Sequence, residues 1–205
     1  MLDLQSVGMY RGMLYETIIT TKNPDGTPNA APIGVICKDK DEIVIYLHEG
    51  SRTVQNVKNN ELFVVNILKD PLIFVESTMD NLSKSYFEEF KGEYFIKDTD
   101  AYFLVEVNDL KDVEREDQFG VSKTSIVKAD VKEIVVNKDC VEPLNRAIYG
   151  VVEALVYLTR KEMVSGETES LYNLRMKEIY RIVNKVGAKE HKTAIRKVLD
   201  AWENK

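Results

Sequence analysis

The hydrophobic pattern of the chain changes its period once, near residue 141, and this change limits the fold more than any other feature. Before it, short runs rich in β-branched residues alternate with polar turns, which is typical of strands. After it, apolar residues recur every three or four positions, which is typical of amphipathic helices. A run of strands followed by a run of helices predicts a β-barrel or sandwich with an appended helical bundle, rather than a doubly wound α/β sheet.

The first part of the chain is therefore expected to be mainly β. The expected strands are residues 16–21, 30–37, 43–47, 62–68, 101–107 and 125–136. The fourth of these is almost continuously apolar, so we expect it to be buried on both faces. Two short helices are expected between the strands: Ser51–Asn60, with Ser51 as N-cap, and Asn81–Lys91, with its apolar residues on one face.

Three amphipathic helices are expected in the second part, with Val164–Gly166 and Gly187 as the breaks between them. Their apolar stripes are Leu144, Ile148, Val151, Leu155 and Leu158; then Tyr172, Met176, Ile179, Val183 and Val186; then Ile195, Val198 and Trp202. We therefore expect two domains, a strand-rich domain over residues 1–140 and a helical C-terminal extension over residues 141–205. The fold class is mainly β, or α+β once the extension is counted.

Composition excludes several classes of function. The net charge of −6 argues against broad binding to nucleic acid, which needs a basic surface. No apolar run is long enough for a signal peptide or a membrane span, so we expect a cytoplasmic protein without membrane contact. The two cysteines and two histidines are scattered, so no metal site is expected. The chain contains no nucleophile elbow, no P-loop and no dinucleotide-binding glycine motif.

One segment has a pattern suited to binding an anion. It runs from a strand through Glu49-Gly50 into the start of a helix at Ser51-Arg52-Thr53. A helix start presents unpaired amides and partial positive charge, Ser51 and Thr53 add hydroxyls, and the Arg52 guanidinium suits phosphate. The alternative from these residues alone is an ordinary N-cap followed by a surface arginine. We call Gly50–Thr53 the cradle.

The wider sequence resembles a known family. Gly50-Ser51-Arg52-Thr53 followed by Asn56, Asn60 and the strand Phe63-Val64-Val65-Asn66 resembles the FMN-binding split barrels of the flavin reductase type. The upstream block Pro24–Gly34, with Glu16-Thr17-Ile18 before it, is similar to an uncharacterised, mainly archaeal group of such proteins with a helical C-terminal region. The resemblance implies an FMN-binding split β-barrel with a three-helix extension, and it covers about residues 10–140.

The resemblance also implies a site. FMN would lie at the interface of a homodimer, with its phosphate at Ser51, Arg52 and Thr53. Its isoalloxazine would lie against the backbone of Ala31, Pro32, Ile33 and Gly34. Asn56 and Asn66 are either polar contacts of the cofactor or structural residues. Lys123, in a stretch resembling a turn (Gly120–Thr124), is a weaker candidate for a distal flavin contact.

The function implied is that of an FMN-dependent oxidoreductase of the flavin reductase type, because bound flavin itself supplies redox chemistry. The partner of such a reaction would be a small-molecule redox substrate or a nicotinamide donor, and the chain has no motif for a nicotinamide site. Two alternatives stay open at this point: a non-catalytic flavin-binding or carrier protein, and a structural or interaction module. The sequence identifies neither the substrate nor the catalytic residues.

Overall fold

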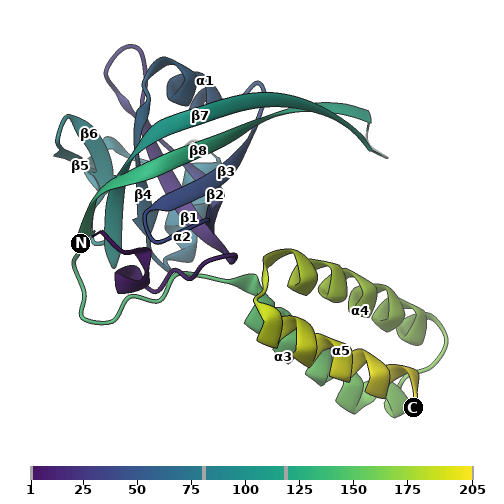
Figure 1. The fold of residues 1–205 in the computed structure, drawn as a ribbon. Helices are drawn as coiled ribbons and strands as arrows, with labels where there is room; N and C mark the ends of the chain where they lie inside the picture. Colours follow the sequence, from purple (N-terminus) through teal and green to yellow (C-terminus); the bar gives the residue numbers. More distant parts are fainter. Residues whose placement is uncertain (1, 80–81, 118–119, 205) are drawn as a thin grey trace. The chain divides into compact units, whose positions relative to one another are not determined.

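The computed structural model describes residues 2–79, 82–117 and 120–204, and it describes the side chains of all of these except 115–117 and 120–122. The chain forms two compact units, Met1–Leu144 and Asn145–Lys205. The first is built mostly of strands and the second of helices, as Figure 1 shows. Each unit is described by itself below.

A closed antiparallel barrel forms the first unit, with strands in the order β1-β2-β3-β8-β7-β4. Its strands are β1 (Leu14–Lys22), β2 (Pro28–Cys37), β3 (Glu42–His48), β4 (Leu62–Ile67), β7 (Ala101–Asp117) and β8 (Gly120–Val136). The ring closes where β4 pairs with β1 over three residue pairs, from Ile18 opposite Asn66 to Thr20 opposite Val64. The predicted barrel with a helical C-terminal region is confirmed.

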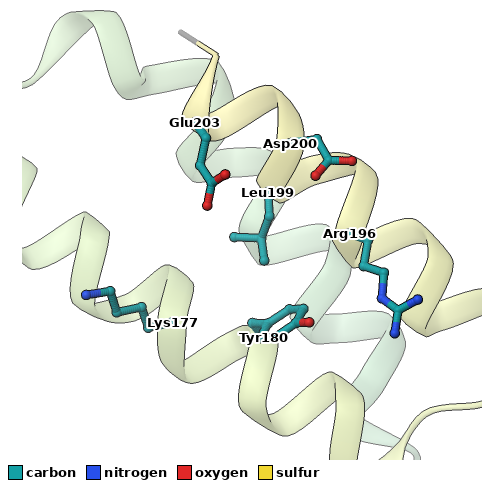
Figure 2. A pocket seen from close by; sticks show the side chains of 6 residues that line it. All are labelled: Lys177, Tyr180, Arg196, Leu199, Asp200 and Glu203. Atoms are coloured by element: carbon teal, nitrogen blue, oxygen red, sulfur yellow. The ribbon is translucent and has the colours of Figure 1, made fainter.

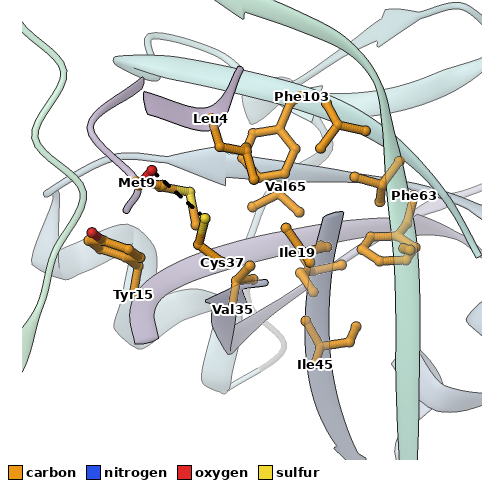
Figure 3. Close-up of a cluster of buried hydrophobic side chains, with 14 of the residues drawn as sticks. Leu4, Met9, Tyr15, Ile19, Val35, Cys37, Ile45, Phe63, Val65 and Phe103 are labelled. Atoms are coloured by element: carbon orange, nitrogen blue, oxygen red, sulfur yellow. Dashed lines mark hydrogen bonds between the residues drawn. The ribbon is translucent and has the colours of Figure 1, made fainter. Parts of the chain in front are cut away.

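Alternate residues of the strands fill the interior of the barrel, as expected for strands with one face inward. The fully buried residues include Ile19, Ile45, Phe63, Val65 and Phe103 (Figure 3). Helix α1 (Arg52–Asn59) adds Val54 and Val57 to this core after β3 ends. The short 3-10 helix Leu4–Val7 adds apolar side chains beside the turn before β3, where the Leu4 amide donates to the Lys40 carbonyl. The 3-10 helix therefore covers the end of the barrel where β3 begins, and α1 covers the end where β3 finishes.

Helix α2 (Pro71–Thr78) and the hairpin of β5 (Phe87–Phe90) and β6 (Glu93–Ile96) cover part of the outer face of the barrel. Ile18 and Ile96 pack there with Ile73 of α2, and Val64 packs with Tyr102 and Leu104 in a second outer cluster. Strand β4 is therefore buried on both faces, as its apolar sequence predicts.

Asn66 ties the β5–β6 hairpin to the seam where the barrel closes. Its Nδ2 donates to the Ile18 carbonyl at 3.0 Å and to Thr20 Oγ1 at 3.1 Å, and its Oδ1 accepts from the Ile96 amide at 2.8 Å. The residue has no exposed surface. Because a buried amide must be paired to avoid a large free-energy cost, all three hydrogen bonds support this arrangement. Of the two roles left open for Asn66, the structure shows the structural one.

The helix predicted over Asn81–Lys91 is wrong for the residues that the structure describes; Asn81 lies outside them. A single 3-10 turn, Lys84–Tyr86, leads into β5 instead. Lys91 (φ 51°) and Gly92 (φ 83°) then form a two-residue turn between the paired residues Phe90 and Glu93. Positive φ at both turn residues is the geometry that hairpins favour, and the glycine was the sequence signal for it.

The structure also contains a helix that was not predicted and two strands that are longer than predicted. The unpredicted helix is α2, although Asp70 followed by Pro71 is a typical helix start; the Asp70 side chain accepts from the Leu72 amide. Strands β7 and β8 each span 17 residues, so they extend well beyond the predicted bounds. Lys123 consequently lies within β8, opposite Glu114 of β7, and the predicted turn at Gly120–Thr124 is wrong.

The helical unit contains α3 (Arg146–Arg160), α4 (Glu167–Val186) and α5 (Lys189–Glu203). All three were predicted, and the breaks at Gly166 and Gly187 precede α4 and follow it. Asn145 caps α3 and also donates to the Val186 carbonyl, so it joins the start of α3 to the end of α4. The indole of Trp202 is buried and donates to Asn173 Oδ1 at 2.9 Å.

The predicted apolar stripe of α3 is partly wrong. The buried residues are Ala147, Val151, Ala154 and Tyr157, whereas Ile148 and Leu155 are exposed. Helix α3 is apolar around most of its circumference, so its periodicity fits two faces almost equally well. The small residues Ala147 and Ala154 lie on the buried face, where the prediction placed the larger residues Ile148 and Leu155.

We predict that Asn66→Ala lowers the free energy of unfolding by about 2–4 kcal/mol, because it leaves buried groups without hydrogen-bond partners. Urea unfolding followed by circular dichroism measures the change. The matched control is Asn108→Ala, which removes an exposed asparagine bonded to Asp130 on the barrel surface. Equal stability of the two variants would show that the Asn66 bonds do not hold the hairpin.

Candidate functional site: a helix start beside an open strand edge

The cradle forms where β3 gives way to α1. Gly50 has φ 88°, a conformation that favours glycine, and a Cβ there would meet nothing within 4 Å. Ser51 is the N-cap: its Oγ accepts from the Val54 amide at 3.3 Å and donates to the His48 carbonyl at 3.2 Å. The first turn of an α-helix has amides that lack partners within the helix. The cradle is therefore an exposed helix start with the side chain of Arg52 beside it.

Thr53 connects the cradle to strand β2. It is 2% exposed, and its Oγ1 accepts from Asn29 Nδ2 at 3.2 Å. Asn29 also donates to Thr21 Oγ1 on β1 at 3.1 Å, and Asn56 donates to that same hydroxyl at 3.0 Å and to Asn23 Oδ1 at 2.9 Å. Thr53 Oγ1 thus accepts, and the Asn56 amide nitrogen donates, in hydrogen bonds within the chain.

The part of β2 next to Asn29 has one free side. β1 pairs with all of β2, but β3 pairs only with Val35–Cys37, so among the described strands Pro28–Gly34 has a single neighbour. We call the other side the open edge. Successive residues of a strand direct their backbone groups to opposite edges. Cys37 donates to the Met13 carbonyl on the β1 side, so odd-numbered residues bond to β1 and even-numbered ones face the open edge.

This alternation divides the four residues predicted to lie against the flavin. Ala31 and Ile33 direct their backbone groups to β1, whereas Pro32 and Gly34 direct theirs to the open edge. Proline has no amide proton, so Ala30 and Gly34 supply the donors there. All four predicted residues are half-buried in the chain. The open edge is a strip of small residues that a flat ring can approach closely.

A network of charged side chains lies next to the cradle and includes Glu49, the residue before Gly50. Lys58 of α1 donates to Glu49 at 2.6 Å and to Asp112 of β7 at 3.1 Å, and Ser125 Oγ lies 3.0 Å and 2.5 Å from the same two carboxylates. The hydrogen bond from Lys58, followed by that from Ser125, lowers the pKa of Glu49. The pKa of Asp112 is also lowered, and there the hydrogen bond from Ser125 contributes more than that from Lys58. The hydrogen bonds to the two carboxylates raise the pKa of Lys58, and the bond to Glu49 contributes more than the bond to Asp112.

Lys123 lies beside this network. The Glu49 amide donates to the Lys123 carbonyl at 3.1 Å, so the strand brings Lys123 next to the cradle. Its ammonium is paired with Glu114 at 3.0 Å, and this bond raises the pKa of Lys123. A pocket of about 360 Å³ lies between these groups, lined by Glu49, Lys58, Asp112, Val113, Glu114 and Lys123. Sequence reasoning missed Lys58 and Asp112 because they meet only through the β7–β8 pairing.

The helical unit contains a pocket of about 400 Å³ between α4 and α5. Figure 2 shows its lining: Lys177, Tyr180, Arg196, Leu199, Asp200 and Glu203. Two cations and two carboxylates line it, and all four are exposed. Its charges cancel and it has no buried polar group that would fix a ligand, so the cradle is the better candidate site.

The family of the chain follows from sequence comparison. Residues 15–138 match the N-terminal domain of a family described as "Protein of unknown function (DUF447)", and residues 145–200 match that family's second model. The chain belongs to the DUF447 family. The uncharacterized protein MJ1453 of Methanocaldococcus jannaschii is 30% identical over 185 residues, covering 88% of this chain and 93% of that one.

Solved structures agree with this assignment. The FMN-bound DUF447 protein MM1853 of Methanosarcina mazei is 28% identical, with a TM-score of 0.56 over 97% of this chain and all of that one. A flavin reductase domain protein of Arthrobacter sp. FB24 is 16% identical and shares the fold alone, with a TM-score of 0.51 over 65% of this chain and 83% of that one. The predicted resemblance to flavin reductase-like split barrels and to an uncharacterised archaeal group is confirmed.

Nowhere in residues 2–79, 82–117 and 120–204 do three or more histidine, cysteine, aspartate or glutamate side chains gather as metal ligands. Within the same ranges, no helix has the length and apolar character needed to cross a membrane.

We predict that Lys58→Met raises the pKa of Glu49, and that of Asp112 less, since Lys58 is the main cause of the lowered Glu49 pKa and Ser125 is the main cause for Asp112. A lowered folded-state pKa stabilises the fold above the unfolded value, near pH 4, and this contribution is lost as the pH falls through the folded value. The wild type should therefore lose more stability on acidification than the variant. Carbon-detected NMR titration of the carboxyl groups measures the shift, with the exposed Lys111→Met as control. An unchanged Glu49 titration would contradict the network.

Proposed function

We propose that this chain binds FMN at the cradle and the open edge of β2, and that it is a flavin-dependent oxidoreductase of the flavin reductase type. The observation that carries the proposal is the hydrogen bond between Asn29 and Thr53, which joins the open edge to the first turn of α1. A phosphate site and a surface for a flat ring are thereby adjacent. The FMN-bound relative of the same family, 28% identical over nearly the whole chain, supports FMN as the ligand.

The residues present fit this cofactor. The helix start and Arg52 would hold the phosphate, because amides and partial positive charge at a helix N-terminus favour anions. The amides of Ala30 and Gly34 face the open edge and would orient polar atoms of the ring. The short cradle has no second phosphate-binding glycine motif, which favours FMN over a dinucleotide. FMN, when bound, would supply hydride and electron transfer, while the protein supplies binding and orientation.

We further propose that the site is completed in a homodimer. Helix α2 exposes Leu72 (68%), Val75 and Met79 (66%), which share one helix face by their spacing. The same helix packs beside β2, since Phe74 and Ala30 belong to one cluster. An apolar strip next to the open edge is suited to a second copy, and two-fold dimers are the commonest closed assemblies. Light scattering of the flavin-loaded protein tests this, and a monomer with full flavin occupancy would contradict it.

The cofactor and the reaction are tested together on purified, reconstituted protein. We expect an absorption spectrum typical of flavin and release of FMN on denaturation, identified by mass spectrometry. We also expect anaerobic NADH or NADPH to bleach the bound flavin in a stopped-flow experiment. Recovery of FAD, or of no flavin, would contradict FMN binding. Bound FMN that neither nucleotide reduces would favour the non-catalytic flavin carrier over the oxidoreductase.

We predict that Arg52→Ala raises the dissociation constant for FMN by about one to two orders of magnitude while the fold is retained. A cation at a helix N-terminus is disfavoured by the helix dipole, so a bound anion would explain its position. A charge-assisted hydrogen bond contributes about 1.5–3 kcal/mol, and about 1.4 kcal/mol corresponds to a factor of ten. Flavin-fluorescence titration measures the affinity.

The matched control for this prediction is Arg11→Ala, which removes an exposed arginine beside the turn before β3, away from the cradle. It should leave FMN affinity unchanged. Arg52→Lys should lie between the wild type and Arg52→Ala, because lysine keeps the charge and loses the planar geometry. Equal affinities of wild type and Arg52→Ala would remove Arg52 from the site and leave only the backbone of the cradle.

A further inference from the structure

A second polar pocket lies at the other end of α1. It has a volume of about 560 Å³ and is open to solvent. Its lining is Lys22, Asn23, Pro24, Asn56, Asn59, Asn60 and Glu93. An α-helix rises about 1.5 Å per residue, so along α1 the lining residue Asn56 lies about 6 Å and Asn59 about 10 Å from Arg52 of the cradle. The pocket is therefore separate from the proposed FMN phosphate site.

Glu93 is the unusual member of this lining. The residue is 4% exposed, and its Oε1 accepts from Asn60 Nδ2 at 2.9 Å. Its Oε2 is buried and has no hydrogen-bond partner within the described part of the chain. A carboxylate oxygen that is buried without a partner costs free energy, so proteins nearly always pair such atoms. A ligand in the pocket that donates a hydrogen bond would remove this cost.

The charges around Glu93 define the class of ligand. The Lys22 ammonium lies 3.5 Å from Glu93 Oε1 and also donates to the Gly92 carbonyl. The Lys22 ammonium already balances the charge of the Glu93 carboxylate. A metal cation would therefore be repelled by Lys22, and an anion would be repelled by Glu93. A neutral hydrogen-bond donor is repelled by neither residue. The Lys22 side chain is about one-third exposed, so it lies at the solvent side of the buried carboxylate.

The asparagines supply the remaining polar groups. The side-chain nitrogen of Asn60 donates to Glu93, and the Asn60 carbonyl oxygen and the exposed amide of Asn59 are the groups that a ligand would meet. The pocket therefore combines several acceptors with one ammonium donor. Adjacent hydroxyl groups both donate and accept, so they match this set better than a single amine or amide does. A carboxylate that accepts from ribose hydroxyls is the same chemistry that nucleotide-binding folds use.

We propose that this pocket binds the adjacent hydroxyls of a sugar, with Glu93 Oε2 accepting from one of them. The sugar is either free or the ribose of a nucleoside, and the two sources share the same contacts. This proposal does not depend on the flavin, because the pocket and the cradle lie at opposite ends of α1.

The test is an NMR titration of the full chain, both with FMN and without it. The probes are ribose, adenosine and 2′,3′-dideoxyadenosine, and the signals are the side-chain amides of Asn56, Asn59 and Asn60. We expect shifts with ribose and adenosine and at least a tenfold weaker effect with the dideoxy compound. Adenosine that binds much more tightly than ribose identifies a nucleoside site, and equal affinities identify a sugar site.

Glu93→Gln places an amide where Oε2 accepts, so it should weaken binding of ribose and adenosine about tenfold or more. The matched control Glu89→Gln, an exposed glutamate on the same hairpin, should bind like the wild type. If Glu93→Gln fails to fold, Asn59→Ala, which changes an exposed lining residue, should also weaken binding. Equal binding of adenosine and its dideoxy analogue, or no shift with any probe, would overturn the proposal. Loss of FMN binding alone would leave these outcomes unchanged.

Discussion

The barrel closes through three residue pairs between β1 and β4, and the rest of the first unit depends on this short seam. Asn66 lies in the seam and bonds both β1 and the β5–β6 hairpin. β1 pairs with β2 along its whole length, whereas β3 pairs with β2 only as far as Ile45, which lies opposite Val35. The open edge of β2 is the stretch that β3 leaves unpaired. The closed ring also fixes β3, whose end directs α1 and the cradle toward that edge.

One short helix presents different chemistry at its two ends. At its start, the first-turn amides have no partners within the helix, and Arg52 adds positive charge. At its end, the partial negative charge of the last carbonyls lies near the buried Glu93, and Lys22 compensates it. Because α1 packs into the barrel through Val54 and Val57, both ends are held on the same rigid frame. Rigid support of this kind is what an oriented cofactor requires.

Patterns within single segments predicted most of the fold. The strand periodicity, the Ser51 cap and the three C-terminal helices all depend on residues close in sequence, and the structure contains each of them. The hairpin of β5 and β6 was missed because Leu82, Tyr86 and Phe90 are spaced as in a helix, while the turn signal rests on Gly92 alone. Local spacing could not distinguish these two readings; packing against Asn66 and Ile18 decides between them.

The candidate site was predictable in outline but not in its contacts. The cradle was found from Gly50 to Thr53, yet the burial of Thr53 depends on Asn29, a residue 24 positions away. The network of Glu49, Lys58 and Asp112 depends on the long β7–β8 pairing, whose length the sequence did not indicate. Glu93 gave no signal in the sequence, because a lone glutamate after a glycine is most often a surface residue.

The prolines of β2 have a consequence for the behaviour of the protein in solution. Exposed strand edges recruit other strands and so promote aggregation. Pro28 and Pro32 are four residues apart, so both face the open edge and both lack an amide proton. An incoming strand would find donors only at Ala30 and Gly34 and could not form a continuous ladder. The edge can thus stay accessible to a small molecule while resisting the strand addition that leads to fibrils.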